Sequence, residues 1–352
     1  MNTISLCDEC YADVPAMANP FPEDTVPMIY KICAVHGMKR GMLEKDKAFY
    51  NQFNTYGRRN KYPIGIINIT GKCNANCKYC FHPRTQEEMP IEQIHDIIKG
   101  VYPSLNGFIL SGGEPTCHSQ YMEILRRLHK SGLTHSMLTN GVLLDDDAFF
   151  YEAIKNGIVD KEQKVCAQIS IHGIAQQGEE VYNHQISFLE KCRKRGLKVH
   201  MAMINLDYGP DGHSIIDEVE KTTAFMQEWR DVVPNWRVRT VCNAWEAQNV
   251  THRRFNSDLV KQFEFRALQD GKEFSLSDLG DTNNIYAICT TYDGMNLALM
   301  GAPSLDSIDL GYLDRGPFML ANDQKWYSVP HALLINEGMG KCWYRGKRID
   351  EV

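Results

Sequence analysis

Apolar residues recur along residues 60–245 in two alternating patterns. Short runs rich in apolar and β-branched residues are typical of buried strands. The longer stretches between them carry apolar residues every three or four positions, as amphipathic helices do. The runs predict six strands, at residues 63–70, 107–112, 135–141, 166–172, 198–205 and 236–242.

The stretches between these strands predict five helices, at residues 90–99, 118–130, 145–157, 179–195 and 215–233. In the first of them, Ile91, Ile94, Ile97 and Ile98 fall on one face. Because strands and helices alternate, we expect an α/β domain of parallel strands joined by right-handed crossovers.

Residues 250–352 show a different pattern. One amphipathic helix is predicted at 256–268, with Asn256 or Ser257 as its cap. Short strands are predicted at 285–291, 295–300, 326–329 and 332–335, separated by turns such as Asp293-Gly294. We therefore expect three parts: a Cys-rich segment over residues 1–50, the α/β domain over 60–245, and a β-rich extension over 250–352 that covers a substrate pocket.

Three closely spaced cysteines follow the first predicted strand. Cys73, Cys77 and Cys80 lie on the loop that leaves its C-terminal end. Cysteine thiolates hold iron–sulfur clusters, and a four-iron cluster normally takes four of them. Three thiolates leave one iron open, and an open iron can bind a small molecule and pass it an electron. A zinc site is the alternative, but it usually shows a second Cys pair or a His at similar spacing, and none follows nearby.

The second predicted strand ends in Gly112-Gly113-Glu114-Pro115. With the CxxxCxxC loop before it, this segment resembles the radical S-adenosylmethionine superfamily, in which both motifs occur in this order, each after a strand. The resemblance covers residues 60–245. It implies a partial (β/α)6 TIM-like barrel, open on one side.

The resemblance also implies the roles of the motif residues. Cys73, Cys77 and Cys80 would ligate a 4Fe–4S cluster, whose fourth iron S-adenosylmethionine would chelate through its amino and carboxylate groups. Tyr79 would lie against the adenine. The methionine amino group would be received by Gly112, Gly113 and Glu114. Glycines allow close approach to backbone carbonyls, and a carboxylate is a charge-assisted acceptor for an ammonium.

Polar residues at the ends of the other strands complete the predicted site, because the working residues of such barrels gather at the C-terminal ends of strands. The candidates are Thr139, Asn140, Ser170, His172, Asn205 and Arg237 or Arg239. The resemblance assigns Ser170 and Asn205 to the ribose and methionine carboxylate. Arg239 is the preferred carboxylate partner, since a guanidinium pairs bidentately with carboxylates. For His172, a catalytic role and a hydrogen-bonded wall residue both remain open.

The resemblance implies a radical reaction. The reduced cluster would cleave S-adenosylmethionine to a 5′-deoxyadenosyl radical, which would take hydrogen from a small-molecule substrate or biosynthetic intermediate. A reductant such as flavodoxin or ferredoxin would supply the electron. One alternative is radical modification, including methylation, of a peptide, lipid or RNA. A second is a non-catalytic iron–sulfur protein, against which the intact motifs argue.

The N-terminal residues carry a second metal signal. Cys7-x-x-Cys10 and Cys33-x-x-His36 fit a tetrahedral site for zinc, or for mononuclear iron, with three Cys ligands and one His. The segment resembles the short Cys-rich prefix of one branch of the superfamily, which acts on pterins and archaeal membrane lipids. Its expected role is structural: the metal would tie an otherwise coreless segment to the barrel.

The other six cysteines are isolated, and Cys166 and Cys242 are expected in buried strands. An auxiliary cluster built from Cys117, Cys289 and Cys342 remains an alternative. Twelve cysteines without a signal peptide indicate metal sites and free thiols, and hence a cytoplasmic protein. No apolar run is long enough to span a membrane. The net charge of −6 argues against a nucleic-acid partner.

Overall fold

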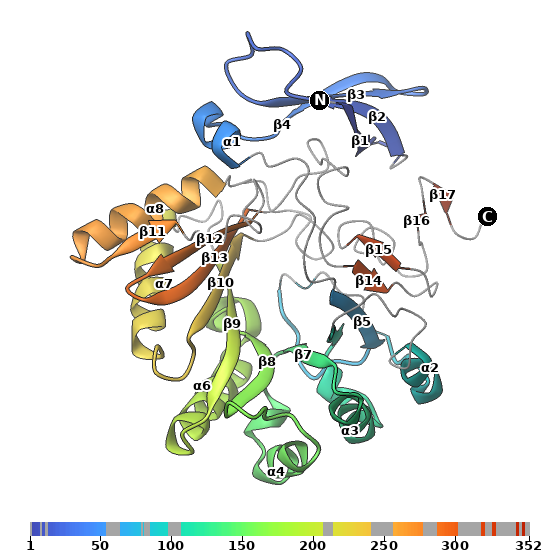
Figure 1. Ribbon diagram of the computed structural model, residues 1–352, viewed down its shortest axis with the longest axis vertical. Helices are drawn as coiled ribbons and strands as arrows, with labels where there is room; N and C mark the ends of the chain where they lie inside the picture. Colours follow the sequence, from blue (N-terminus) through green and yellow to red (C-terminus); the bar gives the residue numbers. More distant parts are fainter. Residues whose placement is uncertain are drawn as a thin grey trace.

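The six predicted strands form one continuous parallel run (Figure 1). The computed structural model describes residues 2–7, 9–10, 13–53, 64–78, 80, 85–97, 107–206, 214–240, 256–276 and 287–301, and the backbone of four short strands between 318 and 348. Parallel pairing joins each strand to the next. The strands are β5 (Ile64–Thr70), β6 (Gly107–Gly112), β7 (Thr134–Thr139), β8 (Lys164–Ser170), β9 (Lys198–Leu206) and β10 (Asn235–Thr240).

Helices follow these strands and cover their outer face (Figure 1). The main ones are α2 (Ile91–Asp96), α3 (Tyr121–Ser131), α4 (Asp147–Lys155), α6 (Glu179–Lys194) and α7 (Ile215–Glu228). Three short turns lie near strand ends: η2 (Pro115–Cys117), η3 (Leu143–Asp145) and α5 (Ile174–Gln177). The alternation and the parallel pairing confirm the predicted α/β class with a TIM-like partial barrel. Among the described helices, none is both long and apolar enough to cross a membrane.

The two faces of the curved sheet differ in polarity. In β10, Trp236 and Val238 are buried against the helices, whereas Arg237 and Arg239 are partly exposed toward the interior. Successive side chains in a strand point to opposite faces, so this alternation sorts apolar residues outward and polar residues inward. The polar site is therefore a direct consequence of strand periodicity.

The C-terminal strands continue the barrel sheet at both of its edges. On one side, β13 (Met295–Met300) pairs in parallel with β10, and β12 (Ala287–Tyr292) and β11 (Phe274–Leu276) follow. On the other side, β14 (Phe318–Leu320) pairs in parallel with β5 and carries β15 (Trp326–Ser328). The strands β16 (Trp343–Tyr344) and β17 (Lys347–Arg348) form a separate pair. The strand expected at 332–335 lies outside the described residues, and the covering role of the extension stays a prediction.

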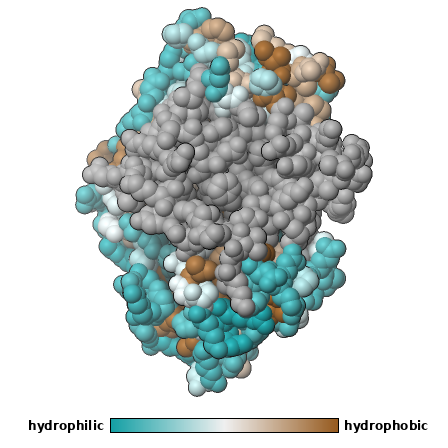
Figure 2. Space-filling model, turned by 45° about the vertical axis from the view of Figure 1, so that its right-hand side comes forward, coloured by the Kyte–Doolittle hydropathy of each residue, from teal (hydrophilic) through white to brown (hydrophobic). Residues whose placement is uncertain are grey.

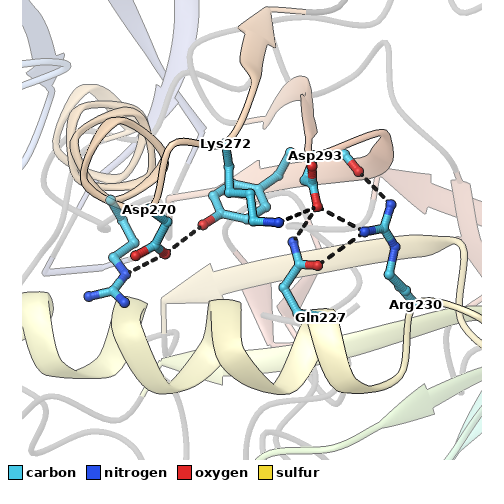
Figure 3. Close-up of polar contacts among 7 residues, drawn as sticks. Gln227, Arg230, Asp270, Lys272 and Asp293 are labelled. Atoms are coloured by element: carbon cyan, nitrogen blue, oxygen red, sulfur yellow. Dashed lines mark hydrogen bonds and ion pairs between the residues drawn. The ribbon is translucent and has the colours of Figure 1, made fainter.

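The turn between β12 and β13 is the predicted Asp293-Gly294 turn. Both residues have positive φ, 48° and 79°, as two-residue hairpins of this kind require. Figure 3 shows how the turn is fastened: the Asp293 carboxylate accepts bonds from Gln227 (3.0 Å) on α7, from Arg230 (2.9 Å) just beyond the end of that helix, and from Lys272 (3.2 Å). These contacts fix the hairpin against the helix layer.

The N-terminal segment is a four-stranded antiparallel sheet followed by a helix, and it lies at the top of Figure 1. From the sequence we expected a segment without a hydrophobic core, and this prediction is wrong. Ala16, Ala18 and Ile29 belong to the main hydrophobic core, and so do the buried aromatic residues of α1. Its elements are β1 (Asn2–Leu6), β2 (Asp13–Ala18), β3 (Met28–Cys33), β4 (Gly37–Met42) and α1 (Lys47–Phe53).

Apolar side chains are also exposed on this segment, and Figure 2 shows brown atoms at this end of the molecule. Ile32, Val35 and Met38 are 54%, 78% and 72% exposed.

Glu44 joins this segment to α8 (Asn256–Gln269). Its carboxylate is buried and accepts bonds from the Ser257 hydroxyl (2.6 Å) and the Ser257 N–H (3.4 Å). The Asn256 side chain, predicted as a cap, instead accepts a bond from the Gly301 N–H at 2.6 Å. A carboxylate from a distant segment therefore meets the start of this helix, where the dipole favours negative charge.

We predict that Glu44→Gln changes the pH dependence of stability. Burial raises the pKa of Glu44 above its usual 4.5, so the folded protein holds this proton to higher pH than the unfolded chain does. As pH rises from about 4.5 to the raised pKa of Glu44, the wild type should lose stability relative to the variant. The loss in free energy of unfolding should be about 1.4 kcal/mol for each pH unit between these two pKa values. Denaturant unfolding from pH 4.5 to 8 measures this difference. Glu264→Gln, at an exposed position of α8, is the control; parallel profiles for wild type and Glu44→Gln would contradict the prediction.

Candidate active site and N-terminal metal site

The loop after β5 carries the three cysteines into one cleft. Cys73, Cys77 and Cys80 are partly buried thiols, and all three line this cleft. The Lys78 N–H donates to the Gln176 carbonyl at 2.8 Å, which fixes the cysteine loop to α5. Tyr79 lies outside the described residues, so its position against an adenine stays a prediction.

Gly112 and Gly113 let the end of β6 pack against the cysteine loop. The Gly113 N–H donates to the Thr70 carbonyl, and the Glu114 N–H to the Lys72 carbonyl, both at 2.8 Å. A Cβ atom would lie 2.2 Å from the Thr70 carbonyl oxygen at Gly112, and 2.4 Å from that of Lys72 at Gly113. These glycines are thus required by the protein's own backbone, a reason that sequence reasoning missed when it considered only the ligand.

Glu114 is surrounded by protein donors. One oxygen of its buried carboxylate accepts from the Thr116 N–H (3.1 Å), the Thr116 hydroxyl (2.6 Å) and the Thr139 hydroxyl (2.7 Å). The other accepts from the Asn140 N–H at 2.7 Å. Burial raises the pKa of Glu114, although these donors oppose the rise. Its observed role is to hold the ends of β6 and β7 together, and contact with an ammonium stays a prediction.

Asn140 ties the next strand end to the cysteine loop. Its Nδ2 donates to the Asn74 Oδ1 at 2.7 Å and lies 4.0 Å from the Cys73 sulfur. The backbone carbonyl of Asn140 accepts a hydrogen bond from the Gln185 side-chain amide (2.9 Å). The same amide also donates to the backbone carbonyl of Ser170 at 2.8 Å. The glutamine therefore links β7 to β8.

Three glutamines of α5 and α6 were missed by sequence reasoning. Gln185 makes the link above, and Gln177 donates to the Ser170 carbonyl (2.8 Å) and accepts from the His172 N–H (2.7 Å). Gln176 donates to the Asn205 carbonyl at 3.0 Å, while its buried Oε1 has no partner in the structure. No motif marks these residues; only their location on the segment after the fourth strand could have suggested them.

His172 lies just beyond β8, so the prediction that this strand includes it is wrong. Its Nδ1 lies 3.0 Å from the Asn205 N–H. A backbone N–H can only donate, so Nδ1 is the acceptor and a neutral ring carries its proton on Nε2. Burial and then Arg239 hold the pKa of His172 well below 6.5. The ring is thus a neutral donor at the cleft wall.

The cleft gathers the described candidates in one place. It is open at its mouth, and it is lined by residues from the cysteine loop and from the ends of β6 to β10. Arg239 donates through Nε to the Asn205 side chain within it. The predicted residues that line the cleft are Cys73, Cys77, Cys80, Gly112, Gly113, Glu114, Thr139, Asn140, Ser170, His172, Asn205 and Arg239.

The isolated cysteines give two further results. Cys166 is half-buried rather than buried, and burial raises the pKa of its thiol to about 11. Burial likewise raises the pKa of Cys117 to about 11. Cys242 and Cys342 lie outside the described residues, so an auxiliary cluster that includes Cys342 stays a prediction.

The N-terminal ligand set is gathered around one point. The ligand atoms of Cys7, Cys10, Cys33 and His36 all lie within 4.8 Å of one another. The sulfurs of Cys10 and Cys33 are 3.8 Å apart, and His36 Nδ1 is 3.4 Å from Cys7 and 3.6 Å from Cys33. Tetrahedral zinc bonds would place two sulfurs about 3.8 Å apart, and a sulfur and a nitrogen about 3.5 Å apart. The geometry therefore fits a single four-coordinate ion.

The surroundings of this set favour metal binding. The N–H groups of His36 and Val35 lower the pKa of the Cys33 thiol, which favours the thiolate that a metal needs. His36 Nε2 lies 3.7 Å from the Glu9 carboxylate, the kind of outer partner that orients a ligating imidazole. The structure thus shows a group able to hold a metal, without identifying zinc or iron.

Comparisons with known proteins agree with this geometry. Residues 67–221 match the family model of the Radical SAM superfamily. The chain is 24% identical over 233 residues to the 7,8-dihydro-6-hydroxymethylpterin dimethyltransferase of Methanocaldococcus jannaschii, which covers 55% of this chain and 44% of that protein. It is 36% identical over 85 residues to a probable GTP 3′,8-cyclase of Methanothermobacter marburgensis, with 23% and 28% covered. The chain spans less than half the length of these curated relatives.

A solved structure supports the fold. The crystal structure of SuiB from Streptococcus suis superimposes with a TM-score of 0.54 at 13% identity, covering 95% of this chain and 85% of that one. At this identity the similarity shows the fold alone.

We predict that Gly113→Ala disrupts the cysteine loop. The added methyl would push against the Lys72 and Gly71 carbonyl oxygens, which would lie 2.4 and 2.7 Å away. The clash should lower the free energy of unfolding by about 1–3 kcal/mol and reduce the iron bound after anaerobic reconstitution. Unfolding curves and iron analysis measure both effects. Unchanged iron binding would show that the loop does not need this close approach.

We predict that Cys33→Ala removes one metal ion and destabilises the N-terminal sheet, because metal binding and folding are coupled in such sites. Elemental analysis of protein prepared without added metal, together with thermal unfolding, measures the loss. Cys192→Ala is the matched control, since Cys192 is fully buried in the main core and belongs to neither ligand set. Equal metal content in Cys33→Ala and Cys192→Ala would refute the site.

Proposed function

We propose that this chain, a member of the radical SAM superfamily through residues 67–221, is an enzyme that uses a 4Fe–4S cluster and S-adenosylmethionine to take hydrogen from a small molecule. One observation carries the proposal. Three thiols, the Gly-Gly-Glu segment and the polar ends of β7 to β10 converge on a single cleft.

The residues of the cleft fit both groups. Among the described residues, the four N-terminal ligands gather around one point, whereas the three thiols of the cleft do not. This wider spacing suits a four-iron cluster, in which each thiolate binds an iron of its own. The buried Gln176 Oε1 has no partner in the structure and lines the cleft, so it offers an acceptor to a bound molecule. A cleft that brings three thiols together with the Gly-Gly-Glu segment and several polar side chains offers ligands to a cluster and hydrogen-bond partners to a chelating cofactor.

When bound, the cluster supplies one electron that splits S-adenosylmethionine into methionine and a 5′-deoxyadenosyl radical, which abstracts hydrogen from the substrate. Cys73, Cys77 and Cys80 hold the cluster and leave one iron open. The remaining residues bind and orient the cofactor and keep water out. Gly112 and Gly113 offer backbone carbonyls to its amino group, with Glu114 behind them.

The remaining cleft residues complete the cofactor site in this proposal. Thr139 and Asn140 fix the wall beside the cysteine loop. Ser170 and Asn205 face the ribose and methionine end, and Arg239 pairs with the carboxylate. His172 donates a hydrogen bond as a neutral ring and transfers no proton.

The substrate is proposed to be a small molecule or biosynthetic intermediate, with a flavodoxin- or ferredoxin-type reductant as partner. The names of the relatives, a pterin dimethyltransferase and a probable GTP cyclase, support small-molecule chemistry. We propose zinc, or mononuclear iron, for the N-terminal site, and the cytoplasm as the protein's location. The alternative of radical modification of a peptide, lipid or RNA would show in the same assay as a dependence on that substrate.

The test is formation of 5′-deoxyadenosine. Anaerobically reconstituted protein with S-adenosylmethionine and dithionite should form it, as measured by mass spectrometry, and Cys77→Ala should lose cluster absorbance and turnover to background. Cys192→Ala, a core substitution outside the cleft, should keep both. Product formation by Cys77→Ala at the wild-type rate would overturn the proposal.

A further inference from the structure

The barrel interior has a second polar layer beneath the cleft. Leu138, Ser170 and Arg239 line the cleft. Each has a polar residue two positions before it on the same strand: these are Ser136, Gln168 and Arg237, respectively. Alternation places these residues on the same interior face, about 7 Å further along the strands. In sheet register, Gln168 pairs with Leu138 and Arg237 with Met203, two residues that line the cleft, so both polar side chains stand next to the proposed reaction site.

Arg237 has no counter-charge among the residues that the structure describes. Its Nη1 donates to the Gln168 Oε1 at 3.3 Å, and its buried Nε has no hydrogen-bond partner. In the part of the chain that the structure describes, no carboxylate contacts it. Burial and then the neighbouring Arg239 lower the pKa of this guanidinium, and only Cys289 acts in the opposite direction. A half-buried cation with a buried Nε that has no partner among the described residues is costly, so this arrangement favours an anion from outside.

Other polar atoms of the same interior also lack partners. Both polar side-chain atoms of Asn68 and the hydroxyl of Ser136 are buried and unpaired. Asn68 pairs in register with Ser111, which lines the cleft, so it shares the interior face. Gln168 accepts from Arg237 through Oε1, which leaves its Nε2 as a donor. Asn68, Ser136 and Gln168 thus add polar atoms to the interior face that carries the guanidinium.

We propose that Arg237 and Gln168 bind an oxyanion of the substrate, a carboxylate or a phosphate, below the cofactor cleft. The inference rests on the proposed function and adds the substrate class: an anionic small molecule. Arg239 lines the cleft and is assigned to the cofactor, whereas Arg237 lies one layer deeper and is free of that role.

The test measures anion binding without turnover. Cluster-reconstituted protein with S-adenosylmethionine is unfolded thermally in sodium chloride alone and with sodium phosphate or sodium succinate at equal ionic strength. Phosphate or succinate should raise the wild-type unfolding midpoint by about 1–3 °C. Arg237→Met should abolish this rise. Its midpoint without added anion should equal or exceed that of the wild type, because an unpaired buried charge has been removed.

The control is Arg230→Met, which removes an exposed arginine paired with Asp293 and should keep the full anion response. A response to phosphate alone assigns a phosphate group to the substrate, and a response to succinate alone assigns a carboxylate. No wild-type response, or an equal response in Arg237→Met, overturns the inference. Arg237→Met with a lowered midpoint in chloride would show a structural arginine instead. Formation of 5′-deoxyadenosine is measured separately, so failure of this inference leaves the proposed function intact.

Discussion

The buried carboxylate of Glu114 is the interaction on which the site depends. Four donors from Thr116, Thr139 and Asn140 converge on it and lock the ends of β6 and β7 together. Asn140, placed in this way, reaches the cysteine loop through Asn74. Leaving one such buried group unsatisfied costs about 1–3 kcal/mol. This hydrogen-bonded unit thus helps to position the loop that carries the cysteines.

The two cysteine groups show opposite designs. The N-terminal group offers four ligands around one point, which closes a coordination sphere and leaves no position for substrate. Its local cluster of buried described residues is small, Cys7, Val14 and Cys33, so a metal would supply much of its stability. The loop after β5 offers three thiols in an open cleft. Glu44 links the N-terminal segment to α8, which packs beside β12 and β13 at one edge of the barrel sheet.

The sequence predicted the six strands, their order and the residues of the cleft, because strand periodicity and the cysteine and glycine motifs are local signals. It did not predict that β13 and β14 extend the two edges of the barrel, since pairing between distant strands is set by the folded chain. The role of Glu114 as an acceptor for protein donors, and the tautomer of His172, depend on backbone N–H groups that fold into place. The hydrogen bonds of Gln177 and Gln185 could not be predicted either, because their partners are backbone groups that come close only in the folded chain.

The central claim is that three thiolates leave one iron open to S-adenosylmethionine. Electron paramagnetic resonance of the dithionite-reduced cluster, recorded before and after adding S-adenosylmethionine, tests it without requiring a substrate. Our account predicts a clear change in the spectrum, because the cofactor becomes a ligand of the cluster. An unchanged spectrum at saturating S-adenosylmethionine would contradict it.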